Sequence, residues 1–139
     1  MTVKEFKYQY ALGALSEEDL KKVAEITTSK YILTTLSKDK NFYVRWGVAK
    51  NPRTPKKILT TFAKDKDWYI KVSVANNPNT PVNVLIKLSE DKEHYVREIV
   101  AGNKNIPKNV LIKLSKDKNH EVRNKVRKVL IYRGIKNDN

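Results

Sequence analysis

Apolar positions recur along this chain with a period of 26 residues. Leu36, Phe62, Leu88 and Leu114 each open a five-residue segment that ends in Asp-Lys, and consecutive members of this set are 26 residues apart. A fixed period of this size is typical of stacked repeat proteins, in which each repeat buries its apolar face against its neighbours.

Each period contains two apolar clusters at helical spacing. In the first, Val44 and Val48 are four residues apart, and Asn51-Pro52 then predicts a helix end, because proline disfavours a helical conformation in the residue before it. In the second, Thr54-Pro55 predicts a helix start, with Thr54 as N-cap and Pro55 as the first helical residue of about ten. Ile58, Leu59 and Phe62 then form its buried stripe. The equivalent apolar positions are Ile70, Val74, Val84, Leu85, Leu88, Val96, Val100, Val110, Leu111, Leu114, Val122 and Val126.

The two ends of the chain depart from the period. Residues 1–35 are predicted to form an N-terminal arm and a degenerate capping repeat, with a capping box at Ser16–Asp19. Residues 36–126 hold the regular repeats. Residues 127–139 form a C-terminal cap, in which the last helix ends at Gly134 and 136–139 are a frayed tail.

Phe6, Tyr8 and Tyr10 alternate with polar residues, a spacing typical of a strand. Two interpretations stay open for this segment. The first, which we favour, is an irregular arm packed on the first repeat. The second is a β-arm that pairs with a partner or with a second copy of the chain.

The run Val44-Arg45-x-x-Val48-Ala49-x-Asn51-Pro52-x-Thr54-Pro55-x-x-Ile58-Leu59 resembles the leucine-rich repeat variant family and, more loosely, HEAT repeats. The resemblance implies an all-α fold, an α-solenoid of four to five helical-pair repeats in a right-handed superhelix. Some members of that family hold an iron–sulfur cluster through N-terminal cysteines. This chain has no cysteine, so the resemblance implies no such cluster here and names no single activity.

The charge balance is strongly basic and uneven. The formal net charge is +14, with 29 basic and 15 acidic residues, and it rises from zero over residues 1–35 to +6 over 36–103 and +8 over 104–139. A basic surface favours a polyanion or an acidic protein as partner. The chain lacks cysteine, a signal-peptide pattern and an apolar run long enough for a membrane span, so we expect a cytoplasmic protein with no membrane partner.

Two columns of charged residues follow the repeat. The first pairs acids with bases six residues later, and we expect it to be a structural ladder that ties loops and neighbouring repeats, although its bases could also grip phosphates. Its members are Asp39, Asp65, Asp91 and Asp117 with Arg45, Lys71, Arg97 and Arg123. The second column has no partner implied, so it is the stronger candidate for polyanion contacts, the alternative being a merely solvated turn. It comprises Lys40, Lys66, Lys92 and Lys118, flanked by Lys38, Lys64 and Lys116. The last helix adds Lys125, Arg127 and Lys128.

Aromatic residues follow the second column directly. Tyr43, Tyr69 and Tyr95 are predicted to pack between repeats. Phe42 and Trp68 are predicted to be more open and are candidates for stacking on bases, because histidines take their place in later repeats.

Signals for catalysis are weak. The sequence has no glycine-rich phosphate loop and no His-Glu-x-x-His motif, and His94 and His120 lack a third metal ligand. We therefore expect no enzyme activity, metal, cofactor or small-molecule substrate. The predicted function is a binding scaffold whose basic surface engages the backbone of DNA or RNA with little sequence specificity. The alternative is an adaptor that holds an acidic protein or an extended peptide in its groove.

Overall fold

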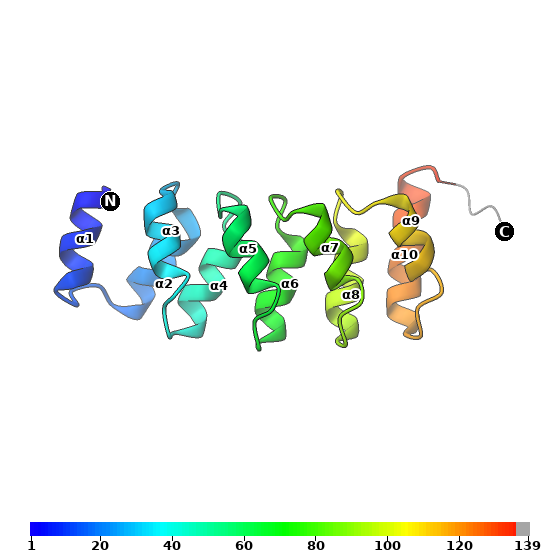
Figure 1. Ribbon diagram of the computed structural model, residues 1–139, viewed down its shortest axis with the longest axis horizontal. Helices are drawn as coiled ribbons and strands as arrows, with labels where there is room; N and C mark the ends of the chain where they lie inside the picture. Colours follow the sequence, from blue (N-terminus) through cyan, green and yellow to red (C-terminus); the bar gives the residue numbers. More distant parts are fainter. Residues whose placement is uncertain (136–139) are drawn as a thin grey trace.

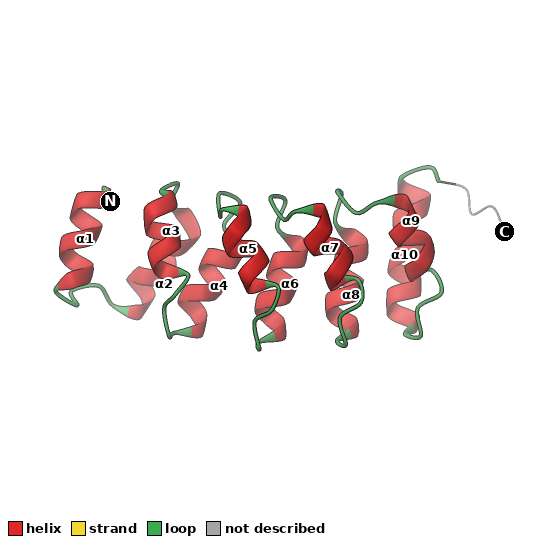
Figure 2. Ribbon diagram, viewed as in Figure 1, coloured by secondary structure: helices red, strands yellow, loops and turns green. Residues whose placement is uncertain are grey.

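The computed structural model describes residues 1–135, and that part of the chain consists of ten helices with no strand. The all-α prediction is confirmed (Figures 1 and 2). The helices are α1 (Val3–Ala11), α2 (Glu17–Ile26), α3 (Lys30–Leu36), α4 (Phe42–Lys50), α5 (Lys56–Phe62), α6 (Trp68–Asn76), α7 (Val82–Leu88), α8 (His94–Gly102), α9 (Lys108–Leu114) and α10 (His120–Tyr132). The predicted tail at 136–139 lies outside the described residues.

Helices α2 to α10 form two rows along one long axis, and α1 lies at the N-terminal end in contact with α3 (Figure 1). In the first row α2, α4, α6, α8 and α10 each contact the next. The second row consists of the shorter helices α3, α5, α7 and α9, which pack on the first row. All connections that enter α4, α6, α8 and α10 turn at one long edge of the molecule, and those that leave α4, α6 and α8 turn at the opposite edge.

The core is a continuous apolar layer between the rows. In one repeat, Val44 and Val48 of α4 and Leu59 of α5 are completely shielded from solvent. The same positions are buried in every later repeat, which confirms both predicted stripes. Gly47 lets α4 approach α2 closely, since a Cβ there would lie 3.0 Å from the Cβ of Ala24 and 3.1 Å from the carbonyl oxygen of Lys21.

The short helices begin later than the sequence predicts. α5 has seven residues, and Pro55, not Thr54, is its N-cap. The Thr54 hydroxyl points backward and donates to the carbonyl oxygen of Val48 at 2.5 Å, and Thr80 makes the same bond to Val74 at 2.6 Å. The threonine therefore adds a second donor to a carbonyl oxygen at the end of the preceding helix, which also accepts the backbone N–H of Asn51 or Asn77.

A buried column of asparagines joins successive repeats. The Asn51 side-chain amide donates to the carbonyl oxygens of Ala24 and Thr27, at 2.8 and 2.9 Å. Asn77 likewise donates to Ala49 and Asn51, at 2.8 and 2.9 Å. Asn103 donates to Ala75 at 2.7 Å. The side-chain oxygen of each also accepts the backbone N–H two residues later, at 2.8 to 2.9 Å, which forms the turn that ends the helix.

Replacing the central asparagine is expected to loosen the stack. Asn77→Ala leaves two carbonyl oxygens without this donor, so we expect the free energy of unfolding to fall by about 2–3 kcal/mol. Asn76→Ala is the matched control, because Asn76 is the adjacent residue of the same type and is exposed. Urea unfolding followed by circular dichroism measures both, and equal effects of the two variants would contradict the assignment.

The N-terminal segment is a helix, so the β-arm and the irregular backbone offered for Phe6–Tyr10 are both wrong, whereas packing on the first repeat is confirmed by the contacts of α1 with α3. Thr2 and Glu5 form a capping box that starts α1, with Glu5 N–H donating to the Thr2 hydroxyl at 3.2 Å and Thr2 N–H donating to the Glu5 carboxylate at 2.6 Å. Phe6 is buried, and its ring stacks on Tyr10 one helical turn later. The alternating spacing of Phe6, Tyr8 and Tyr10 wrongly suggested a strand, because Tyr8 is not part of the buried face of the helix and is exposed.

The last described helix departs from the asparagine column. The asparagine column would next fall at position 129, which is valine, and Arg133 supplies the donors instead. Its guanidinium donates to the carbonyl oxygens of Asn103 and Ile106, each at 2.9 Å. α10 runs through Tyr132 and Gly134 follows with a φ of +65°, which confirms the predicted end. The predicted capping box at Ser16–Asp19 is also confirmed.

Candidate functional site

Four similar turns lie along one edge of the molecule, immediately before α4, α6, α8 and α10 (Figure 1, lower edge). We call this the lysine edge and define it by Lys38, Lys40, Lys64, Lys66, Lys92, Lys116 and Lys118. All seven side chains are exposed. The turns follow one another because the helices that they precede are stacked.

Each turn is shaped by its aspartate. The carboxylate oxygen accepts the backbone N–H two residues later in all four repeats, at 2.7 to 3.0 Å. The acceptors are Asp39, Asp65, Asp91 and Asp117. This local bond turns the aspartate into the molecule, while the lysines on either side of it in sequence are exposed.

The predicted structural ladder connects each turn to the next repeat. Lys71 contacts Asp91 at 2.6 Å, and Arg97 donates to both carboxylate oxygens of Asp117 at 2.8 Å. Arg45 lies 3.6 Å from Asp65 and 3.3 Å from Asp67. Arg123 is not in an ion pair within residues 1–135 and donates to the backbone carbonyl of its own turn, that of Asp117, at 2.6 Å.

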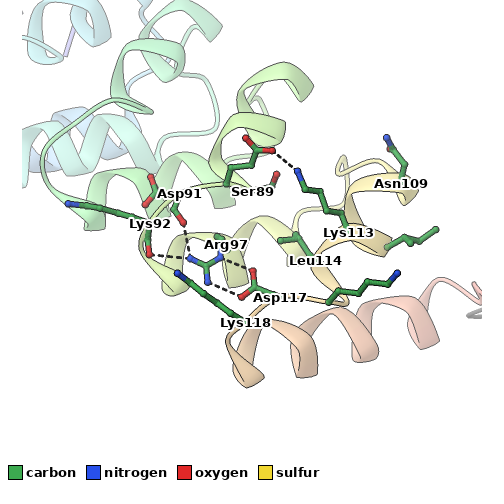
Figure 3. Close-up of a pocket in the computed structure, with 12 residues that line it drawn as sticks. Ser89, Asp91, Lys92, Arg97, Asn109, Lys113, Leu114, Asp117 and Lys118 are labelled. Carbon is green, nitrogen blue, oxygen red and sulfur yellow. Dashed lines mark hydrogen bonds and ion pairs between the residues drawn. The ribbon is translucent and has the colours of Figure 1, made fainter.

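The same arginines hold the backbone of the lysine turns. Arg97 donates to the carbonyl oxygens of Asp91 and Lys92, at 2.8 and 3.2 Å, and Figure 3 shows it bridging this turn to Asp117. Arg45 makes the equivalent bonds in the first turn, at 3.1 and 3.0 Å. An arginine thus holds the backbone of the turns before α4, α8 and α10, whereas Lys71 at the equivalent position bonds only to Asp91 of the next turn.

Burial and ion pairing reduce the negative charge that these aspartates present at the surface. The side chains of Asp65, Asp91 and Asp117 are 13%, 11% and 8% exposed, each beside a cation of the preceding repeat. Hydrogen bonds from Arg97 hold the pKa of the Asp117 carboxyl below its ordinary value. Within residues 1–135, no acidic side chain lies within ion-pair distance of any lysine of the lysine edge.

A groove of about 730 Å³ lies between the last two turns. Lys92, Lys116 and Lys118 line it together with Lys113, which contacts Glu90 at 2.6 Å on the exposed rim. Figure 3 shows the Lys92 side chain extending away from the buried ion pair. A groove of about 470 Å³, lined in part by Lys64, occupies the equivalent place between the first two turns.

The order of exposure of the aromatic residues is the opposite of the prediction, although Tyr69 and Tyr95 do contact Phe42 and Trp68 of the preceding repeats as predicted. Phe42 and Trp68 are half-buried and pack against the core, so they are not the open stacking surfaces that were predicted. The exposed rings are those of Tyr43, Tyr69 and Tyr95, at 58%, 54% and 47% exposure. Phe42 and Trp68 are thus the more buried members of the aromatic pairs, and the tyrosines are the more exposed ones.

The cations predicted on the last helix lie apart from the lysine edge. Arg127 and Lys128 are exposed two turns into α10, and Lys125 is half-buried beside Gly102. Lys125 and Lys128 line a separate pocket of about 270 Å³ between α8 and α10.

Two further features bear on the candidate chemistry. Among residues 1–135, no group of three or more histidine, aspartate or glutamate side chains is placed to hold a metal ion. No helix in the same part of the chain has both the length and the apolar character needed to cross a membrane.

Comparison of the chain with protein-family models, with curated proteins and with solved structures finds no significant match in any of the three.

Proposed function

We propose that this chain is a non-enzymatic binding scaffold whose lysine edge engages the backbone of a nucleic acid with little sequence specificity. One observation carries the proposal. In every turn the repeated aspartate faces inward and is held locally or by a cation of the preceding repeat, so the first, second and fourth turns each expose two lysines. The third turn exposes Lys92 together with Glu90, whose carboxylate is paired with Lys113 at 2.6 Å.

The stacking of the repeats supports the choice of a polymeric partner. Neighbouring helices pack at about 8–10 Å, so successive turns present charge at regular intervals along an edge. A polymer with a charge at every unit can contact several turns at once, whereas a small anion can contact only one. Lysine offers a point charge without the paired donors that read base edges, which favours contacts to phosphates over sequence recognition.

The proposal extends to the architecture. We propose that the two rows of helices form an α-solenoid of the kind found in leucine-rich repeat variant and HEAT-like proteins, working in the cytoplasm. The 26-residue period, the stacked contacts of α2 through α10 and the asparagine column support this. In such an array the binding surface is the sum of identical small contributions from each repeat.

The salt dependence of binding tests this proposal. We expect a fluorescently labelled single-stranded oligonucleotide to bind at low salt, with the logarithm of the association constant falling linearly as the logarithm of salt concentration rises. Four lysine–phosphate contacts on a single strand correspond to a slope of roughly −3. Fluorescence anisotropy at several salt concentrations measures it.

Absence of binding to any DNA or RNA at low salt would overturn the proposal. A stoichiometric complex with an acidic protein that survives at moderate salt, without nucleic-acid binding, would favour the adaptor function instead. The same lysines would serve that partner, so the nucleic-acid titration is the deciding experiment.

A further inference from the structure

The aromatic side chains beside the lysine edge form one continuous row across three repeats. Trp68 stacks on Tyr69 with ring centroids 3.8 Å apart and on Tyr95 with centroids 5.2 Å apart. Phe42 packs edge-on against Tyr43 at 5.3 Å and against Tyr69 at 6.3 Å. The row therefore links α4, α6 and α8 through their first turns.

The row has a buried side and an exposed side. Phe42 and Trp68 anchor it to the core, while Tyr43, Tyr69 and Tyr95 present about half of their surface to solvent. We call these three side chains the tyrosine row. Trp68 covers part of the Tyr69 and Tyr95 rings, and His94 also lies against Tyr95 with centroids 3.9 Å apart, so a base can stack only on the ring surface that stays exposed. Because these neighbours already hold the rings, stacking costs little conformational entropy.

Each tyrosine accompanies one lysine of the lysine edge. Tyr43 follows Lys40 by three residues, and the same spacing recurs between Lys66 and Tyr69 and in the next repeat. Every one of these three repeats thus offers an exposed lysine and an exposed tyrosine three residues apart in sequence, at the turn and the first helical turn that follows it. A nucleotide has the matching pair of groups, a phosphate and a base.

We infer that the tyrosine row makes the lysine edge selective for single-stranded nucleic acid, with unpaired bases stacking on Tyr43, Tyr69 and Tyr95 while the phosphates contact the lysines. This inference rests on the proposed function. A duplex keeps its base faces stacked inside the helix and offers only phosphates, sugars and groove edges. A single strand can turn its base faces outward, and base–aromatic stacking tolerates any sequence.

The row ends at the fourth repeat. Glu121 stands where the earlier repeats have tyrosine, and its carboxylate lies 3.3 Å from the Nε2 atom of His94. An exposed carboxylate repels phosphate and offers no stacking surface. The structure therefore limits the stacking contribution to three repeats, although the lysine edge continues to Lys118.

The test compares oligo(dT) and oligo(U) with a DNA duplex of the same length. We expect the single strands to bind more tightly than the duplex. The triple variant Tyr43→Leu, Tyr69→Leu and Tyr95→Leu should weaken single-strand binding by about tenfold or more and leave duplex binding unchanged, because leucine keeps apolar packing but removes the ring face. The matched control replaces three exposed tyrosines outside the row, Tyr8, Tyr31 and Tyr132, and should bind like the wild type.

A variant that is expected to gain affinity provides a second test, because a loss of folding cannot increase binding. Glu121→Tyr extends the row into the fourth repeat and should raise single-strand affinity above that of Glu121→Gln, which removes only the charge. Equal binding of duplex and single strands with no effect of the tyrosine variants would overturn the inference and leave the proposed function standing. A wild-type protein that binds none of the three probes would instead overturn the proposed function.

Discussion

Reversing the charge of the four repeated lysines is expected to abolish nucleic-acid binding. The variant carries Lys40→Glu, Lys66→Glu, Lys92→Glu and Lys118→Glu. We expect affinity for a single-stranded oligonucleotide to fall by at least about 100-fold at low salt, because each exchange replaces an attraction to phosphate by a repulsion. Fluorescence anisotropy measures the loss, and circular dichroism should show unchanged helicity, since the side chains are exposed and only their backbone atoms bond to the fold.

The control for this variant has the same net charge but leaves the edge intact. Lys30, Lys56, Lys104 and Lys108 are exposed, and they lie at or beside the starts of α3, α5 and α9, toward the opposite edge (Figure 1). Their replacement by glutamate also lowers the formal net charge of +14 by eight units. If both quadruple variants lose binding equally, attraction is a property of overall charge and the lysine edge is not the site.

Breaking the buried ion pair between repeats is expected to cause the largest loss of stability. Arg97 and Asp117 have side chains 6% and 8% exposed. Arg97→Met keeps a long side chain but leaves the Asp117 carboxylate without its cation, which costs about 3–5 kcal/mol for buried pairs. Arg53→Met is the matched control at an exposed arginine and should change stability by less than about 0.5 kcal/mol.

The effect of Arg97→Met should depend on pH in a definite direction. The pKa of Asp117 is lowered in the folded protein, chiefly by its hydrogen bonds with Arg97, so this pair stabilises the fold fully above the unfolded pKa of about 4. Its contribution is lost as the pH falls from there through the folded pKa. The stability difference between wild type and variant should therefore be largest near pH 7 and shrink below about pH 4. A constant difference in urea unfolding across this range would contradict the account.

Periodicity made most of the fold predictable. The apolar stripes at Val44, Val48 and Leu59 recur with every repeat, and a pattern repeated several times is hard to mistake. The N-terminal helix was missed because a single copy of Phe6, Tyr8 and Tyr10 carries two spacings at once. The signal that favours a helix is the Thr2–Glu5 capping box, which begins before the alternating aromatic residues.

Side-chain direction was much harder to predict than element position. The sequence shows Asn51-Pro52 as a helix stop, but the asparagine column bonds across repeats, and Asn103 does so where lysine replaces the proline. Only the comparison of all three repeats singles out the asparagine as the shared residue. In the aromatic pairs, the two adjacent side chains point in different directions from the helix. The dipeptide Phe42-Tyr43 alone does not indicate which of the two rings faces the core.

The location of the contact surface tests the central claim most directly. Backbone amide resonances of the protein, 139 residues long, can be followed by NMR while unlabelled oligo(dT) is added. The account predicts shifts concentrated in residues 38–43, 64–69, 90–95 and 116–121, which hold the lysine edge and the tyrosine row. Shifts concentrated instead in the opposite turns at 51–55, 77–81 and 103–107 would contradict it.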